Sequence, residues 1–280
     1  MTRQTNQACE KPNRTKVPCS TPDRSALTHT QRDKALFDHI STSYAAKDQN
    51  PPARVARAYR LWETVREMEP TPEDRILEVG CGAGFSADYL DGRFKQYLGI
   101  DYSDALIEKA RARWSHATSK VEFRSVDIRD FRCTDLFDRI FMIGVLHHIE
   151  SPEEVLRNLL PMLKPGAPIL CNEPSRSNPI IQLLRRCRTK IDPAYSDDQA
   201  VYRPKELTRL FAQAGFVNIH IRPQGFFSTP FAEVPSRPVR VFSILARMSC
   251  FFDRMLARNA PMVLRPLAWN LVVRAHRPNN

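Results

Sequence analysis

The chain has no long run of apolar residues, although 42% of its 280 residues are hydrophobic. A helix that crosses a membrane needs about 18 or more consecutive apolar residues, and the N-terminus has no apolar core of a signal peptide. The sequence therefore predicts a protein that is neither secreted nor transmembrane. Its length suits one large α/β domain with additions.

Cysteine pairs with functional spacing are also missing. The seven cysteines are scattered, and none of them form a C-x-x-C pair for zinc binding or redox chemistry. Histidine and aspartate likewise show no metal-ligand spacing, so no metal site is predicted. Scattered cysteines in odd number favour a reducing, cytoplasmic compartment.

Acidic residues are rare at both ends of the chain. Residues 1–30 carry a net charge of +3 and residues 222–280 a net charge of +7, which leaves +1 of the total +11 for the segment between them. Residues 1–30 also lack large apolar side chains, which predicts a disordered basic tail. A basic protein invites a nucleic-acid partner, but here the charge lies outside the central segment and no recognisable RNA-binding module is appended.

The stretch Asp74–Leu90, DRILEVGCGAGFSADYL, combines an apolar strand, a glycine-rich turn and the start of a helix. Glycine lets the backbone approach a ligand closely at such a turn. The dinucleotide fingerprint would need glycine where Phe85 stands. The spacing is instead Glu78-x-Gly80-x-Gly82-x-Gly84. A carboxylate at the end of the strand would repel a pyrophosphate, but it suits a ligand with an ammonium group and no phosphate, such as S-adenosylmethionine.

A second carboxylate, Asp101, ends the next predicted strand about 20 residues past the glycine turn, where it can accept both hydroxyls of a ribose. A third, Asp127, closes the strand that follows. Further along, the run LHHI…LKPGAPIL extends from Leu146 to Leu170. With these features the chain resembles the class I S-adenosylmethionine-dependent methyltransferases, in particular the branch that acts on small molecules. The resemblance covers about Leu36 to Phe216 and a last strand near the C-terminus.

The resemblance implies an α/β fold with a doubly wound, seven-stranded, Rossmann-like sheet, preceded by N-terminal helices. It implies S-adenosylmethionine as the cofactor, with Tyr102 packing on the adenine and Asp127 accepting from its amino group. A purely packing role for Tyr44 and a solvated turn position for Asp127 stay open. The implied contacts are Tyr44, Glu78, Gly80, Cys81, Gly82, Gly84, Asp101, Tyr102, Asp127, Ile128 and Gly144.

The candidate catalytic residues follow the fourth and fifth predicted strands. His147 and His148 come after one strand and Glu173 ends the other. Since the carboxyl ends of parallel strands face one crevice, a histidine and Glu173 are expected to meet there. A carboxylate raises the pKa of an imidazole and fixes its tautomer, which suits a general base. His147 is the first choice, and a histidine that only lines the cleft is the alternative.

More than 40 residues separate the sixth predicted strand from the last, Trp269–Ala275, and a connection this long is typically functional. Residues 239–258 have the pattern of a helix with a broad apolar face, with arginines every seven residues on its other side. That face either packs on the domain as a lid over the acceptor cleft or also docks on an anionic membrane. The predicted organisation is a tail (1–30), a methyltransferase core (31–222), a helical lid or insertion (223–267) and a last strand with its tail (268–280).

The main hypothesis is methyl transfer to a small, largely apolar acceptor, with O-methylation of a natural-product, quinone or lipid-like substrate as the expected reaction. The chain lacks the Asn-Pro-Pro-aromatic motif of methylation at base amino groups and the Pro-Cys pair of cytosine C5 chemistry. A nucleic-acid methyltransferase that uses the basic ends is one alternative. A protein that binds S-adenosylmethionine without catalysis is another. The sequence predicts neither the acceptor nor the oligomeric state.

Overall fold

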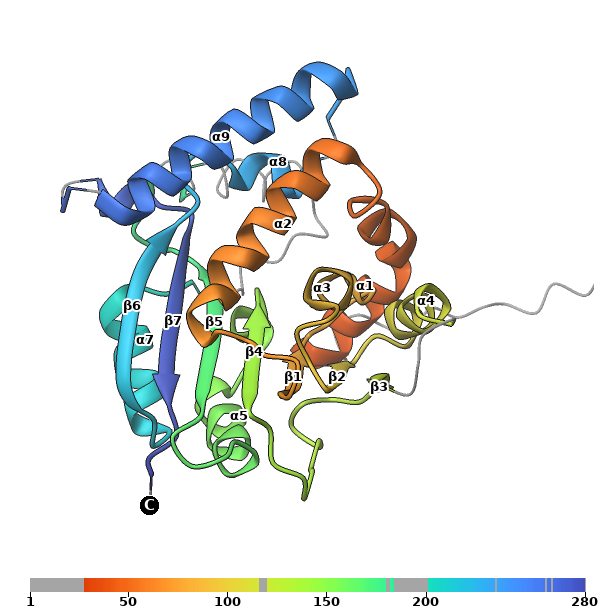
Figure 1. Ribbon diagram of the computed structural model, residues 1–280, viewed down its shortest axis with the longest axis vertical. Helices are drawn as coiled ribbons and strands as arrows, with labels where there is room; N and C mark the ends of the chain where they lie inside the picture. Colours follow the sequence, from red (N-terminus) through yellow and green to blue (C-terminus); the bar gives the residue numbers. More distant parts are fainter. Residues whose placement is uncertain are drawn as a thin grey trace, which may run out of the picture.

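A computed structural model describes residues 28–115, 120–179, 182–183, 201–234, 236–259, 261–262 and 264–279. The strands in these residues are β1 (Arg75–Val79), β2 (Gln96–Asp101), β3 (Val121–Ser125), β4 (Arg139–Ile143), β5 (Pro168–Pro174), β6 (Val217–Gln224) and β7 (Asn270–His276). They form one sheet in the order β3-β2-β1-β4-β5-β7-β6 (Figure 1). β1 to β5 run parallel, and β7 lies antiparallel between β5 and β6. The predicted doubly wound, seven-stranded sheet is confirmed.

Helices cover both faces of this sheet (Figure 1). They are α1 (His29–Ala46), α2 (Pro51–Val65), α3 (Phe85–Leu90), α4 (Asp104–Arg113), α5 (Pro152–Leu159), α7 (Pro204–Gln213), α8 (Thr229–Glu233) and α9 (Val239–Asn259). Leu61 of α2, Leu90 of α3 and Ile107 of α4 belong to the apolar core on one face. Leu156 of α5 and Phe211 of α7 belong to the core on the other. Burial of these side chains supplies the main driving force for the layered arrangement.

The N-terminal helices begin where polar side chains cap them. The Thr28 hydroxyl accepts from the N–H of Gln31, and the Gln31 side chain accepts from the N–H of Thr28. Because this cap starts α1 at His29, the predicted tail of residues 1–30 is wrong at its C-terminal end. The rest of that prediction, residues 1–27, lies outside the described residues.

The insertion between the last two strands is helical, as predicted, and contains α8 and α9. Because β6 continues to Gln224, the insertion begins at Gly225 and not at residue 223. α9 packs along α2 and against β6 (Figure 1). No helix in the described residues is both long and apolar enough to cross a membrane.

The broad apolar face of α9 points to solvent. Among the α9 side chains whose burial the structure describes, those of Ala246, Cys250 and Asp253 are buried. The exposed ones include Val241, Ile244, Leu245, Met248, Phe251, Phe252 and Met255. The interpretation that the domain's own surface covers this face is therefore wrong.

Candidate active site

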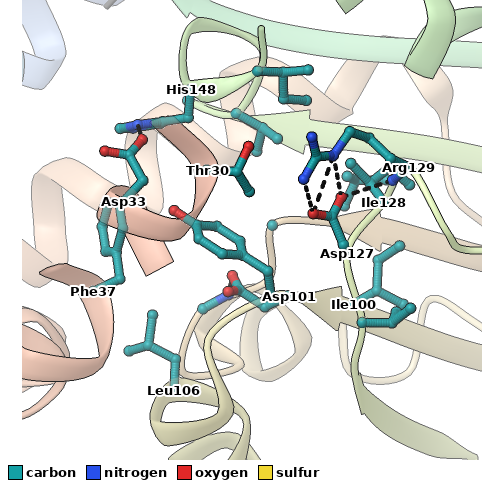
Figure 2. A pocket seen from close by; sticks show the side chains of 18 of the residues that line it. Thr30, Asp33, Phe37, Ile100, Asp101, Leu106, Asp127, Ile128, Arg129 and His148 are labelled. Atoms are coloured by element: carbon teal, nitrogen blue, oxygen red, sulfur yellow. Dashed lines mark hydrogen bonds and ion pairs between the residues drawn. The ribbon is translucent and has the colours of Figure 1, made fainter. Parts of the chain in front are cut away.

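A pocket lies at the carboxyl ends of β1, β2 and β4, beside α1 (Figure 2). Its walls come from α1, from the turn after β1 and from the segments that follow β2, β3 and β4. Ligands of doubly wound sheets bind at this edge. None of the lining residues belongs to α9.

The glycine turn keeps one side of the pocket open. Gly80 and Gly82 both have positive φ, and both line the pocket. A Cβ atom at Gly80 would lie 2.4 Å from Val145 Cγ2, whereas one at Gly84 would lie 2.9 Å from the ring of Phe123. Gly80 and Gly84 therefore both permit close packing, and Gly84 differs from the first two glycines in that it does not line the pocket.

Asp101 lies in the pocket wall as a fixed acceptor. Its two carboxylate oxygens accept the N–H groups of Gly82 and Ser103, each at 2.9 Å. Burial raises the pKa of Asp101, although these two hydrogen bonds act against the rise. Held in this way, the carboxylate has further lone pairs for the ribose hydroxyls that the sequence assigned to it.

Tyr102, Asp127 and Ile128 line the same pocket, as expected for the adenine end. Arg129 makes a bidentate contact with Asp127, from Nε to Oδ1 at 3.0 Å and from Nη2 to Oδ2 at 2.6 Å (Figure 2). Burial would raise the pKa of Asp127, but the hydrogen bonds from Arg129 lower it overall, so this carboxylate stays ionised. The buried hydroxyl of Tyr102 has no hydrogen-bond partner among the described residues, and a ligand in the pocket can supply one.

Glu78 faces a second cavity on the other side of the glycine turn. Gly80, Gly82, Tyr44 and Ile143 line both cavities, which makes the two adjoining parts of one site. Gly144 lines only the first of these two cavities, and Cys81 lines only the second.

The Glu78 carboxylate accepts hydrogen bonds from the hydroxyls of Ser86 and Tyr97. Complete burial raises its pKa to about 7, although these two hydrogen bonds act against the rise. A cation beside Glu78 would favour its ionised form.

Arg57 of α2 also lines this second cavity, although nothing in the sequence pattern marks it as a site residue. The side chain is buried, with its Nε 2.7 Å from Asp48 Oδ1 and its guanidinium 5.3 Å from the centre of the Tyr44 ring. An ammonium group near Glu78 and a carboxylate near Arg57 match the amino-acid end of S-adenosylmethionine. The residues of both cavities thus fit the expected cofactor.

The two candidate histidines have different surroundings. His148 lines the pocket, and its Nδ1 lies 2.8 Å from Asp33 Oδ2 (Figure 2). His147 is buried, and its Nδ1 lies 2.8 Å from Glu173 Oε2. The two rings are tilted against each other with their centres 4.1 Å apart.

Glu173 holds the backbone of this loop as well. It is fully buried and accepts the N–H groups of Val145 and Leu146, each at 2.9 Å. Burial would raise the pKa of Glu173, but the hydrogen bond from His147 and the backbone donors lower it below its ordinary value. The predicted meeting of a histidine with Glu173 is observed, but neither His147 nor Glu173 lines the pocket. Of the two candidate histidines, the one that lines the pocket is thus His148 and not the first choice, His147, and its carboxylate partner is Asp33 of α1, which carries no signal in the sequence.

The described residues contain no cluster of His, Cys, Asp and Glu that could hold a metal ion. Burial raises the pKa values of the Cys81 and Cys171 thiols well above their ordinary value. Neither thiol is therefore suited to act as a nucleophile.

Residues 29–221 match the family model described as "Methyltransferase domain". Over 155 residues the chain is 30% identical to a demethylmenaquinone methyltransferase of Clavibacter sepedonicus, covering 54% of this chain and 61% of that protein. Over 157 residues it is 27% identical to a ubiquinone biosynthesis O-methyltransferase of Alkalilimnicola ehrlichii, covering 51% of this chain and 60% of that protein. The chain thus spans less than two thirds of the length of these two relatives.

The fold is similar to that of a methyltransferase from Thermotoga maritima, whose structure is described as that of a possible histamine N-methyltransferase. The TM-score is 0.59 at 18% identity, over 87% of this chain and 98% of that one. At this identity the similarity shows the fold alone. The match of the family model over more than half of the chain, together with the strand order and the two adjoining cavities, establishes that the chain belongs to the class I S-adenosylmethionine-dependent methyltransferases.

Proposed function

We propose that this chain transfers the methyl group of S-adenosylmethionine to a hydroxyl oxygen of a small, largely apolar acceptor. The observation that carries this proposal is the pair of His148 and Asp33 on the wall of the pocket. An imidazole held by a carboxylate is the arrangement of a general base, and a hydroxyl acceptor must lose its proton during transfer.

The bound cofactor supplies a methyl group that is already activated by the positive sulfur. The Asp33 carboxylate accepts a hydrogen bond from Nδ1–H of His148, which leaves the lone pair of the neutral ring on Nε2. His148 takes the hydroxyl proton as the acceptor oxygen bonds to the methyl carbon and the carbon–sulfur bond breaks, leaving its electron pair on sulfur. Asp33 then stabilises the imidazolium that forms.

His147 and Glu173 act as positioning residues in this account. Glu173 fixes two N–H groups of the loop and the ring of His147, which packs against the ring of His148. This support restricts the orientation of His148, and a fixed base lowers the entropic cost of reaching the reactive geometry.

The apolar character of the acceptor is inferred from the pocket wall. Phe37, Ile143, Val145 and Ile149 give this wall an apolar part, beside the charged side chains assigned above to the cofactor and to the base. The names of the two relatives, a demethylmenaquinone methyltransferase and a ubiquinone biosynthesis O-methyltransferase, support a quinone-related phenol or a lipid-like substrate. Contact with a membrane, where such acceptors are found, is a separate proposal that rests on α9.

The proposal is tested with a prenylated catechol and with its dimethyl ether, which has the same shape and no free hydroxyl. With methyl-labelled S-adenosylmethionine, we expect one labelled methyl group on a catechol oxygen and no transfer to the ether. A methyl group on a ring carbon, located by NMR, would contradict oxygen as the accepting atom. Tight cofactor binding without transfer to any hydroxylated probe would favour the alternative of a non-catalytic binding protein.

A further inference from the structure

α9 is held on the domain in one orientation. The buried carboxylate of Asp253 accepts the N–H groups of Phe226, Phe227 and Ser228 at 2.8–3.0 Å. On the same side of the helix, the small side chains of Ala246 and Cys250 are buried. Small residues allow the close approach to α2, so the opposite side of α9 is turned outward by the fold itself.

The outward side of α9 is apolar along most of its length. Phe251 is 62% exposed, Ile244 60%, Met255 55% and Val241 52%. With about 3.6 residues per turn, these positions share one side of the helix with Leu245, Met248 and Phe252. The segments before and after α9 in the chain carry further exposed apolar side chains, Phe227, Val234 and Met262. Exposed apolar side chains in this number mark an interaction surface.

Arginines run along one edge of this apolar side. Arg240, Arg247 and Arg254 are all exposed and recur every seven residues. The acidic residue of α9, Asp253, is buried and fully used by backbone donors. Trp62 of α2 lies in the groove beside Arg247 and Phe251 and is 40% exposed. The surface therefore combines apolar, aromatic and cationic groups and offers no negative charge of its own from α9.

We propose that α9 is an interfacial helix that docks this protein on an anionic lipid bilayer. Its apolar side inserts at the boundary between headgroups and acyl chains, while the arginines along its edge contact the phosphates. Tryptophan is enriched at this depth of a bilayer, which suits the place of Trp62. The inference rests on α9 and its neighbours and does not depend on the proposed methyl transfer.

A second copy of the chain fits this surface less well. One side of a helix of 21 residues is about 30 Å long and about 10 Å wide, or about 300 Å², whereas a stable interface buries about 800 Å² on each partner. Two copies of α9 would also bring arginines together without carboxylates from α9 to pair with them. An anionic bilayer supplies both an unlimited area and the opposite charge.

The test is flotation of the full chain with vesicles of phosphatidylcholine, alone or with about a third phosphatidylglycerol. We expect flotation with the anionic vesicles at about 0.1 M salt and its loss at about 1 M, since the Debye length falls from about 10 Å to about 3 Å. Failure to bind anionic vesicles at the lower salt would overturn the proposal.

Two matched variants separate charge from insertion. Arg240→Gln with Arg247→Gln should weaken binding by roughly fivefold for each arginine. Lys205→Gln with Arg209→Gln removes the same charge from α7, on the opposite face of the sheet, and should leave binding unchanged. Phe251→Ser with Phe252→Ser should lower binding by about tenfold or more for each ring. All variants should keep the wild-type melting temperature and cofactor affinity.

Three other outcomes would contradict insertion into a bilayer. Binding that survives the double phenylalanine variant would reduce the contact to surface charge. A dimer that dissociates in that variant, without vesicle binding, would assign the surface to a second copy. Salt-sensitive binding to single-stranded RNA, again without vesicle binding, would assign the arginines to nucleic acid.

Discussion

Nδ1 of His148 lies 2.8 Å from Oδ2 of Asp33, so a histidine that follows β4 is held by a carboxylate of α1, 115 positions earlier in the chain. Behind it, His147 makes the corresponding contact with Glu173. The orientation of the pocket-facing ring thus depends on how α1 closes over the ends of the strands. We therefore expect Asp33, which lies far from the glycine turn in the sequence, to affect the rate of methyl transfer through the orientation of His148.

The first prediction concerns the ribose. Asp101→Ala should weaken the binding of S-adenosylhomocysteine by about 1.5 to 3 kcal/mol, the typical loss of a hydrogen bond to a charged group. Calorimetric titration measures this loss, with exposed Asp91→Ala as the control. The wild type should discriminate against the 2′-deoxy ligand, and the variant should bind both ligands about equally. Undiminished affinity of the variant would remove Asp101 from the ribose site.

The second prediction concerns the amino-acid end of the cofactor. Arg57→Gln should weaken the binding of S-adenosylhomocysteine by about 1.5 to 3 kcal/mol, because the carboxylate of the ligand loses a charged partner. The variant should bind 5′-methylthioadenosine, which lacks the amino-acid group, as the wild type does. Arg54→Gln, an exposed change on the same helix, serves as the control. An equal loss for both ligands would reduce Arg57 to a packing residue.

The third prediction concerns pH. Burial raises the pKa of Glu78 from 4.5 to about 7, so the folded protein binds more protons than the unfolded chain between these values. The free energy of unfolding should therefore fall as pH rises through this window, by at most about 1.4 kcal/mol per pH unit. In Glu78→Gln this contribution is absent. Urea unfolding of the cofactor-free proteins at about pH 5 and about pH 8 measures this difference. Relative to the wild type, the free energy of unfolding of the variant should be higher at about pH 8 than at about pH 5. Parallel pH dependence of the two proteins would contradict the raised pKa.

Much of the site could be predicted because its parts are local in sequence. Glu78, the glycine turn, Asp101 and Asp127 each end or follow a strand, and parallel strands bring those ends to one edge. The order of the predicted strands is therefore enough to predict that these residues lie close together in the fold. Asp33 and Arg57 carry no such signal, since a charged residue on an amphipathic helix has the pattern of a solvated face. Only the packing of α1 and α2 over the strand ends places them in the two cavities.

The orientation of α9 shows a second limit. Its periodicity indicates an apolar side, but periodicity does not tell whether that side meets protein or solvent. Here the buried carboxylate of Asp253, with its three backbone donors, fixes the other side of the helix on the domain. A polar contact of Asp253 with the segment that follows β6 therefore determines which side of α9 faces the domain.

The central claim is that His148, oriented by Asp33, removes the proton of the acceptor hydroxyl. Single-turnover rates with saturating S-adenosylmethionine and the prenylated catechol test it most directly. The account predicts that His148→Ala lowers the rate by about 10² to 10⁴ and that Asp33→Asn lowers it less, while exposed His220→Ala keeps the wild-type rate. A wild-type rate in His148→Ala, with bound acceptor verified by titration, would contradict it.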